Sequence, residues 1–272
     1  MILINGEEKN CINVSDRGLQ FGDGLFETMS VRNGKIRFLQ LHLERLHCGC
    51  ERLAILPPDN ILLKRELAQI SAVQIDGVIK LVLTRGDSPR GYRYTKDIRS
   101  NRIITHSERP TIAPDNALSG VRIKFCLTRI ARNPLLAGIK HLNRLENVIA
   151  RAEWQDESIA EGLLCDTEGY VVEGTMSNLF FIKNNELITP TLEYSGVNGI
   201  VRKRILQYAK DLNINCIQKS FTVDELSSFD AGFVCNSIIG IWPIRELIDR
   251  IQYSVDHTII RKLQNLFEND DT

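Results

Sequence analysis

One lysine near the middle of the chain stands directly after a run of apolar residues. Lys140 follows the apolar residues 135–139, and the turn-forming pair Asn133-Pro134 precedes them. Apolar neighbours remove water from an ammonium group and so disfavour its charged form. A neutral amine is the form that attacks a carbonyl carbon, so this segment predicts a lysine that can form a Schiff base. The alternative is a lysine whose ammonium extends from a strand end into water.

Two further features could bind an anion. Arg45 falls about 100–120° from the apolar stripe of its predicted helix, on a flank from which it could lean into an adjacent cleft. A guanidinium presents paired donors to phosphate oxygens. Another predicted helix starts at Gly199-Ile200, where free N–H groups and the helix dipole favour an anion. The alternatives are a solvated helix arginine and an ordinary helix start.

The elements that would position these residues fall into two groups. The first has predicted strands over residues 1–4, 27–32, 78–84 and 102–106 and helices over 39–53 and about 60–74. The second has predicted strands over residues 121–127, 162–165, 170–172, 179–182, 233–235 and 241–244, and helices from the lysine segment to about 155, over 201–212 and over 255–267. Residues 107–120, with two prolines and little apolar pattern, form the natural connection.

This order of elements predicts an α+β protein with two domains. The first domain covers residues 1–112, and the second covers residues 113–272 and carries Lys140. Pockets form preferentially where two domains meet, so we expect the active site in the interdomain cleft.

Composition and charge narrow the class of protein. The chain has 272 residues, of which 43% are hydrophobic and 25% charged, as in soluble globular proteins. Lys+Arg and Asp+Glu both number 34, so the net charge does not favour nucleic acid or an anionic membrane as a partner. The N-terminus reaches a polar turn too soon for a signal peptide, and the most apolar segment, residues 232–244, is too short to cross a membrane. A cytoplasmic protein is predicted.

The cysteines point to the same compartment. They are odd in number, seven, and most lie in apolar segments, which is typical of free thiols in a reducing environment. Cys48 and Cys50 lie near His42 and His47, which could suggest zinc. On a helix these two histidines are about 140° apart and cannot share a face, so no metal site is predicted.

The segment around Lys140 resembles that of a known enzyme family. Asn133-Pro-Leu-Leu-Ala-Gly-Ile-Lys-His-Leu-Asn-Arg-Leu-Glu-Asn147 is similar to the lysine segment of the fold type IV pyridoxal-phosphate enzymes. These include branched-chain aminotransferases, D-amino acid aminotransferases and 4-amino-4-deoxychorismate lyases, and the segment looks most like that of the lyases. The resemblance rests on five motifs and extends from Leu3 to Ile244. It implies a two-domain fold type IV protein with pyridoxal 5'-phosphate (PLP) bound to Lys140.

The resemblance also implies the other cofactor ligands. Glu173, in Val171-Val-Glu-Gly-Thr-Met-Ser-Asn-Leu-Phe180, occupies the position of the carboxylate that keeps the PLP ring nitrogen protonated. The alternative is an exposed glutamate at the end of a hairpin. The phosphate ligands implied by the family motifs are Arg45, Gly199, Ile200, Asn236 and Ser237.

Residues of two other motifs bear on the choice of reaction. Thr28 stands where branched-chain aminotransferases typically carry glycine, and its hydroxyl could guide a proton to a departing group. An ordinary strand threonine is the alternative. Phe26 replaces the tyrosine of D-amino acid aminotransferases. Arg90 and Tyr92 match the positions that bind substrate carboxylate in those enzymes, but Tyr92 replaces a frequent histidine. These departures favour the lyases.

The resemblance therefore implies an enzyme of folate biosynthesis that converts 4-amino-4-deoxychorismate to 4-aminobenzoate and pyruvate. It also implies a small-molecule substrate and a homodimer. The first alternative is a D-amino acid or branched-chain aminotransferase. The second is a non-catalytic paralogue that acts as a binding module, which the presence of Lys140, Glu173 and Arg45 disfavours.

Overall fold

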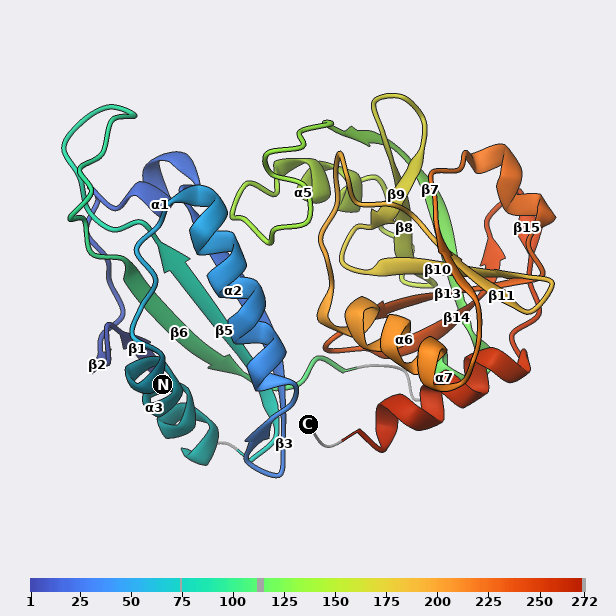
Figure 1. Ribbon diagram of the computed structural model, residues 1–272, viewed down its shortest axis with the longest axis horizontal. Helices are drawn as coiled ribbons and strands as arrows, with labels where there is room; N and C mark the ends of the chain where they lie inside the picture. Colours follow the sequence, from blue (N-terminus) through green and yellow to red (C-terminus); the bar gives the residue numbers. More distant parts are fainter. Residues whose placement is uncertain (74, 112–114, 271–272) are drawn as a thin grey trace. The chain divides into compact units, whose positions relative to one another are not determined.

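The computed structural model describes residues 1–73, 75–111 and 115–270 (Figure 1). The chain divides into two compact units. The first unit contains Met1–Pro110 and Ile139–Asn143, and the second contains Thr111–Gly138 and Arg144–Asp271. Lys140, expected in the second domain, therefore groups with the first unit, because its segment is hydrogen-bonded to Gly24 and Phe26. Each unit combines a sheet with helices, which confirms the α+β fold class. The predicted boundary between residues 112 and 113 lies outside the described residues, and the location of the active site in a cleft stays a prediction.

The sheet of the first unit is antiparallel at every pairing found between its described strands, in the order β2-β1-β6-β5-β3-β4. Its strands are β1 Ile2–Ile4, β2 Glu7–Glu8, β3 Gly24–Arg32, β4 Lys35–Ile36, β5 Gly77–Thr84 and β6 Asn101–Ser107. The four predicted strands of this half are confirmed. The turns Asn5-Gly6 and Asn33-Gly34 have positive φ at both residues, as the sequence of such turns demands.

The helices of this unit are α1 Arg17–Phe21, α2 Leu39–Leu53 and α3 Asn60–Val73. The two long helices were both predicted from their apolar spacing, and both predictions are confirmed. α2 buries Leu43, Leu46 and Cys50 and packs against β3. It ends at Leu53, with Ala54 in the left-handed conformation, before the two prolines.

The sheet of the second unit is mixed, in the order β12-β11-β10-β13-β14-β7-β8-β9, with β15 paired to β14. Its strands are β7 Val121–Ile130, β8 Ile159–Asp166, β9 Val171–Gly174, β10 Asn178–Lys183, β11 Glu186–Thr189, β12 Cys216–Gln218, β13 Ala231–Asn236, β14 Gly240–Leu247 and β15 Ile251–Gln252. The predicted strands are confirmed, and the structure adds three short strands that were not predicted, β11, β12 and β15.

The helices of the second unit are α4 Asn116–Ser119, α5 Leu145–Arg151, α6 Ile200–Asp211, the 3-10 helix Val223–Ser228 and α7 Thr258–Glu268. α6 packs against β13, α7 packs against β14, and the two helices contact each other (Figure 1). The helix after the lysine segment was predicted to reach about residue 155, but α5 ends at Arg151. Its apolar residues Leu145, Val148 and Ile149 are exposed rather than buried.

The cysteines are all free thiols, and Cys50, Cys126, Cys165 and Cys235 are buried. Burial raises the pKa of Cys50 and of Cys126 to about 12, so these thiols stay protonated and act as small apolar side chains. Among the helices of the described residues, none combines the length and the apolar character that crossing a membrane requires.

Candidate active site

The Lys140 segment is attached to the edge of β3. The Phe26 N–H donates to the Lys140 carbonyl at 2.9 Å, and the Leu142 N–H donates to the Gly24 carbonyl at 3.0 Å. Lys140 and Phe26 are therefore opposite each other across a short antiparallel pairing, and their side chains share a face. The Lys140 Nζ lies 4.3 Å from the centre of the Phe26 ring. Lys140 is half-buried, so its amine lies against an aromatic surface without being sealed from solvent.

Thr28 and Lys80 lie on this same face of the sheet. Thr28 is two residues after Phe26 on β3, and its register partner on β5 is Lys80. The Lys80 Nζ lies 5.5 Å from the centre of the Phe26 ring. The structure thus brings together three residues that the sequence singled out, Phe26, Thr28 and Lys140. It also adds Lys80. Lys80 lies opposite Thr28 only because β3 pairs with β5, and the sequence analysis did not consider that pairing.

Glu27 points to the other face of β3, where α2 packs. Its carboxylate accepts from Arg45 Nε at 2.8 Å and from Arg45 Nη2 at 2.5 Å, and His42 Nδ1 lies 2.6 Å from Oε2. Burial would raise the pKa of Glu27, but the charges and hydrogen bonds of Arg45 and His42 outweigh it and lower the pKa to about 2. Burial also lowers the pKa of His42, more than its contact with Glu27 raises it. Glu27 is thus an ionised carboxylate in the core.

Arg45 is therefore anchored more firmly than its flank position on α2 suggested. A bidentate pair with a buried carboxylate fixes the plane of the guanidinium, whose side chain remains 12% exposed. His42 Nε2, behind it, is buried and has no hydrogen-bond partner among the described residues. The structure therefore places an oriented cation on α2, and its contact with a phosphate stays a prediction.

Glu173 belongs to the second unit and lies on β9 opposite Leu164 of β8. It is 4% exposed, so the alternative of a solvated glutamate at a hairpin end is wrong. The Val197 N–H donates to its Oε2 at 2.8 Å. A buried carboxylate is costly unless it has partners, and the Val197 N–H is one partner of Glu173.

The start of α6 lies next to Glu173 through the same valine. Asn178 Nδ2 donates to the Val197 carbonyl at 2.8 Å. Val197 is three residues before Ile200, where α6 begins. Gly199 is the N-cap residue, and no side chain caps the helix there. A Cβ on Gly199 would lie 2.0 Å from Asn178 Oδ1, so only glycine fits. The first N–H groups of α6 therefore remain able to face a ligand.

Asn236 and Ser237 form the turn between β13 and β14. Asn236 Oδ1 accepts from the backbone N–H groups of Ile238 and Ile239 at 2.8 and 2.9 Å. Its Nδ2 donates to the Met176 carbonyl at 3.0 Å, which links this turn to the one between β9 and β10. Because β10 pairs with β13, Glu173, the start of α6 and the Asn236 turn are all held around one end of these strands.

Glu161 on β8 holds the turn that follows Glu173, and the sequence analysis missed it. Its buried carboxylate accepts from Thr175 N at 2.9 Å, from Thr175 Oγ1 at 2.5 Å and from Ser177 Oγ at 2.7 Å. Burial raises the pKa of Glu161 despite these hydrogen bonds. A strand glutamate with no charged partner gives little signal in a single sequence, because its two hydroxyl donors lie 14 and 16 residues away.

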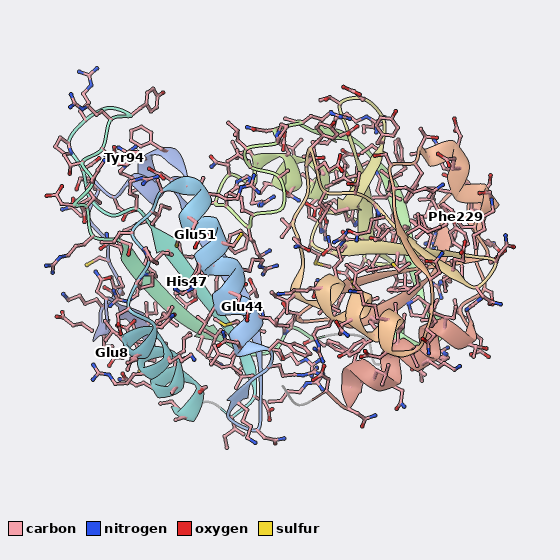
Figure 2. All side chains as sticks on the ribbon, in the orientation of Figure 1. Glu8, Glu44, His47, Glu51, Tyr94 and Phe229 are labelled. Carbon is pink, nitrogen blue, oxygen red and sulfur yellow. The ribbon has the colours of Figure 1, made fainter. Side chains whose placement is uncertain are left out.

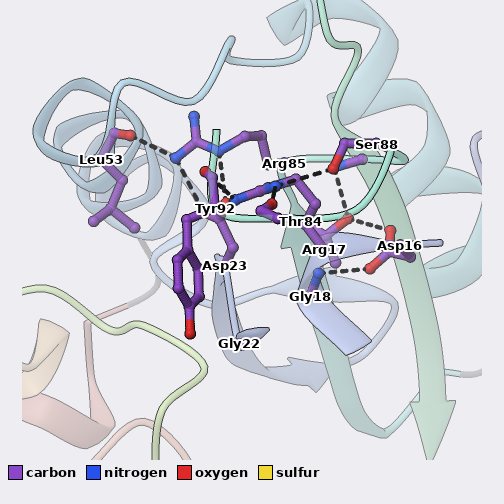
Figure 3. A network of polar contacts seen from close by, with 12 residues as sticks. Asp16, Arg17, Gly18, Gly22, Asp23, Leu53, Thr84, Arg85, Ser88 and Tyr92 are labelled. Atoms are coloured by element: carbon purple, nitrogen blue, oxygen red, sulfur yellow. Dashed lines mark hydrogen bonds and ion pairs between the residues drawn. The ribbon is translucent and has the colours of Figure 1, made fainter. Parts of the chain in front are cut away.

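Arg90 and Tyr92 lie in the loop that follows β5 in the first unit. Both side chains are exposed, Tyr92 to 83%. The Tyr92 ring lies 5.3 Å from that of Phe21 and points away from the polar network around Arg17 and Arg85 (Figure 3). Their predicted contact with a substrate carboxylate stays a prediction.

A separate groove of about 360 Å³ lies between α2 and α3 and contains none of the predicted site residues. Its lining includes Glu44, His47 and Glu51, which follow one side of α2 (Figure 2). Within the described ranges, no group of three or more His, Cys, Asp and Glu side chains is arranged to hold a metal ion.

Each unit contains groups whose chemistry fits PLP. The aldehyde of this cofactor requires an amine, its ring nitrogen a carboxylate, and its phosphate a group of N–H donors. Lys140 provides the amine in the first unit, and Glu173 provides a buried carboxylate in the second. The uncapped start of α6 lies beside Glu173 and provides N–H donors.

Comparison with known proteins agrees with this chemistry. Residues 24–247 match the amino-transferase class IV family. The aminodeoxychorismate lyase of Vibrio harveyi is 31% identical over 244 residues, which cover 90% of each chain. The D-alanine aminotransferase of Bacillus licheniformis is 29% identical over 256 residues, covering 90% of this chain and 88% of the relative.

The fold matches solved structures of the same group. The crystal structure of 4-amino-4-deoxychorismate lyase from Pseudomonas aeruginosa superposes with a TM-score of 0.95 at 43% sequence identity and covers 100% of both chains. The family match spans most of the chain, and the two relatives match it over 90% and 88% of their own length. The chain therefore belongs to the amino-transferase class IV family and is an enzyme that depends on PLP.

Proposed function

We propose that the protein is an aminodeoxychorismate lyase that forms 4-aminobenzoate and pyruvate. The observation that carries the proposal is the placement of Lys140 and Thr28 on one face of the first unit, with Lys140 opposite Phe26 and Thr28 two residues after Phe26 on β3. This pair offers an amine and a hydroxyl, the two groups that an elimination needs. The similarity to the lyases of Vibrio harveyi and Pseudomonas aeruginosa supports the same reaction.

In the proposed reaction, Lys140 and Thr28 handle protons at two different atoms of the substrate. Bound PLP supplies an electron sink for the bond that breaks. The Lys140 amine accepts the proton from C4. The bond between C3 and the enolpyruvyl oxygen breaks, and the Thr28 hydroxyl guides a proton to the departing group, which becomes pyruvate. The ring that remains is aromatic, and this makes the step favourable.

The cofactor would be held by residues from both units. In the first unit, Lys140 would bind the aldehyde and Arg45, oriented by Glu27, would bind the phosphate. In the second unit, Glu173 would pair with the ring nitrogen. The remaining phosphate ligands would be Gly199, Ile200, Asn236 and Ser237, from the start of α6 and the turn after β13.

Substrate recognition would depend on cationic and aromatic side chains of the first unit. The substrate carries two carboxylates, and Lys80 is an exposed ammonium beside Thr28 on the same face. Arg90 and Tyr92, both exposed, would bind a carboxylate from the loop after β5. Phe26 provides an apolar surface for the substrate ring and lacks the hydroxyl that a tyrosine would bring to amino transfer.

We also propose a homodimer. The second unit exposes Leu127 on β7 and Leu145, Val148 and Ile149 on α5, which packs on β7. Apolar residues clustered in this way are typical of surfaces that another protein covers. Light scattering should give twice the mass of one chain, and Val148→Glu with Ile149→Glu should give monomers. Leu118→Glu, a matched change at an exposed leucine on α4, should leave the dimer intact.

We place the protein in the cytoplasm, a proposal that its free thiols support.

A substrate panel tests the proposed reaction against the aminotransferases. Purified holoenzyme is offered 4-amino-4-deoxychorismate, D-alanine with 2-oxoglutarate, and leucine with 2-oxoglutarate in parallel. The proposal expects kcat/KM for the first to exceed that for either amino donor by at least about a hundredfold. A higher value for either amino acid would instead make the protein an aminotransferase.

A further inference from the structure

The loop that follows β5 is held at its base by the segment that precedes α1. The Arg17 N–H donates to the Gly86 carbonyl at 2.9 Å, and the Ser88 N–H donates to the Ser15 carbonyl at 3.3 Å. These backbone bonds fix where the loop leaves the sheet. They do not reach the tip at residues 90–92, which has no regular secondary structure.

The side chain of Arg17 does reach the tip. Its guanidinium is buried, with the whole residue 3% exposed. Nη1 donates to Ser88 Oγ and to the Gly91 carbonyl, both at 3.0 Å, and Nη2 donates to the Tyr92 carbonyl at 3.0 Å (Figure 3). The Arg17 side chain therefore binds the loop at three residues, Ser88, Gly91 and Tyr92.

A shared carboxylate connects Arg17 to the rest of the unit. Asp23 accepts from Arg17 Nε at 2.8 Å and from Arg85 Nε at 2.7 Å (Figure 3). Arg85 also donates to the Leu53 and Ala54 carbonyls at the end of α2, at 2.8 and 2.7 Å. Burial opposes ionisation of Asp23, but Arg85 and Arg17 outweigh it, and the pKa of Asp23 is lowered. The loop is thus tied to the start of β3 and to the end of α2.

This anchoring fixes the backbone of the tip but buries none of its functional side chains. Tyr92 is 83% exposed and Arg90 is exposed, although the Tyr92 carbonyl binds a buried guanidinium. Burying a charge is costly unless every donor finds a partner. Because the tip adds no large side chain to the core, stability alone does not explain why Arg17 is used in this way.

We propose that Arg17 is a positioning residue that fixes residues 88–92 so that Arg90 and Tyr92 are presented to a carboxylate of the substrate. The inference rests on the proposed function, since it takes the substrate to be an anion that these residues bind. Arg17 itself does not touch the substrate. It acts through the carbonyl groups of Gly91 and Tyr92. A lysine at this position could not donate to these two carbonyls, to Ser88 and to Asp23 at once.

Two variants and a control separate this role from a general loss of stability. Arg17→Lys keeps the charge but loses the planar set of donors, and Ser88→Ala removes one partner while leaving Arg17 in place. The control is Arg102→Lys, because Arg102, like Arg17, pairs with a carboxylate of the same unit: it forms a bidentate pair with the buried Glu66 on α3. Hydrogen exchange of residues 85–94 is measured in the holoprotein without substrate, beside KM, kcat and PLP affinity.

Arg17→Lys should speed exchange in the loop and raise KM for 4-amino-4-deoxychorismate about tenfold, with kcat and PLP affinity within about twofold of the wild type. Ser88→Ala should act in the same direction by about threefold in KM. Arg102→Lys should change neither loop exchange nor KM.

Unchanged loop exchange in both Arg17→Lys and Ser88→Ala would overturn the proposal, as would an unchanged KM beside faster exchange. Equal effects of Arg102→Lys on KM would also overturn it, because they would reveal a loss of stability alone. A wild-type protein inactive on 4-amino-4-deoxychorismate would contradict the proposed function. Faster exchange confined to the loop would still support the anchoring by Arg17 in that case.

Discussion

The Lys140 Nζ lies 4.3 Å from the centre of the Phe26 ring, and the backbones of the two residues are joined by a hydrogen bond. The same ring has a second ammonium beside it, that of Lys80 at 5.5 Å. Two lysines thus contact one aromatic side chain, and only one of them can hold the cofactor. Both lysine backbones pair with β3, Lys80 opposite Thr28 and Lys140 opposite Phe26, but Lys140 is half-buried whereas Lys80 is exposed.

Borohydride reduction of the holoprotein, followed by peptide mapping, should place a phosphopyridoxyl group on Lys140. Lys80→Arg should leave this labelling unchanged, whereas Lys140→Arg should abolish it, because the amine that binds the aldehyde is then missing. Label recovered on Lys80 in the wild type would move the cofactor lysine to β5.

Glu27 should make the first unit sensitive to acid. Its pKa of about 2 lies below that of an unfolded glutamate, so its ionised form stabilises the folded state above about pH 4.5, by roughly 3 kcal/mol, and this stability is lost as the pH falls toward 2. Glu27→Gln leaves Arg45 and His42 without a buried anion and should cost about 3–5 kcal/mol at pH 7.

Urea denaturation measures this difference at two pH values. The difference between wild type and Glu27→Gln should fall by about half at pH 3, because the wild type has then lost much of its advantage. Glu168→Gln removes an exposed partner of Arg132 and should cost less than about 1 kcal/mol at both values. A Glu27→Gln cost that does not vary with pH would show that the carboxylate charge is not what stabilises the unit.

Much of the fold followed from local patterns in the sequence. The apolar spacing of α2 and α3 and the Asn-Gly turns after β1 and β3 are local signals, and the structure has them at the expected residues. The short strand β12 depends on β11, a partner far along the chain, and β15 has only two residues, so their own residues carry too little information. The predicted end of α5 was wrong, because its exposed apolar residues follow a helical period without facing a core.

Site residues that lie in short contiguous motifs were predicted, whereas residues whose partners are distant in the sequence were not. Phe26, Thr28 and Lys140 were identified from two short segments, and β3 brings them together. The partners of Arg45 were not identified, because Glu27 lies 18 residues away on a neighbouring strand. Lys80 and Glu161 were missed for the same reason, since their roles arise only from the pairing of strands.

Glu173→Gln should keep the fold and bind PLP but lose activity by on the order of a hundredfold, because an amide cannot hold the ring nitrogen protonated. The glutamine can still accept the Val197 N–H, so the start of α6 should stay in place. Absorbance of the bound cofactor, its affinity and kcat are measured together. Glu246→Gln, at a half-buried ion pair of the same unit, serves as the control. Full activity of Glu173→Gln would refute the electronic role.

Thr28→Val should lower kcat for elimination by about one to two orders of magnitude and leave PLP affinity unchanged, because it removes a hydroxyl without changing the shape of the side chain. Thr28→Ser retains the hydroxyl and should keep most of the activity. If valine and serine lower kcat equally, the hydroxyl takes no part in the reaction and Thr28 is an ordinary strand residue.

The most direct test of the account is the product balance from 4-amino-4-deoxychorismate. Wild-type holoenzyme should form 4-aminobenzoate and pyruvate in equal amounts, with both quantified in the same reaction. Lys140→Ala should form neither, because the group that accepts the C4 proton is absent. Wild-type protein that transfers amino groups from D-alanine or leucine efficiently and leaves 4-amino-4-deoxychorismate unconsumed would contradict the account.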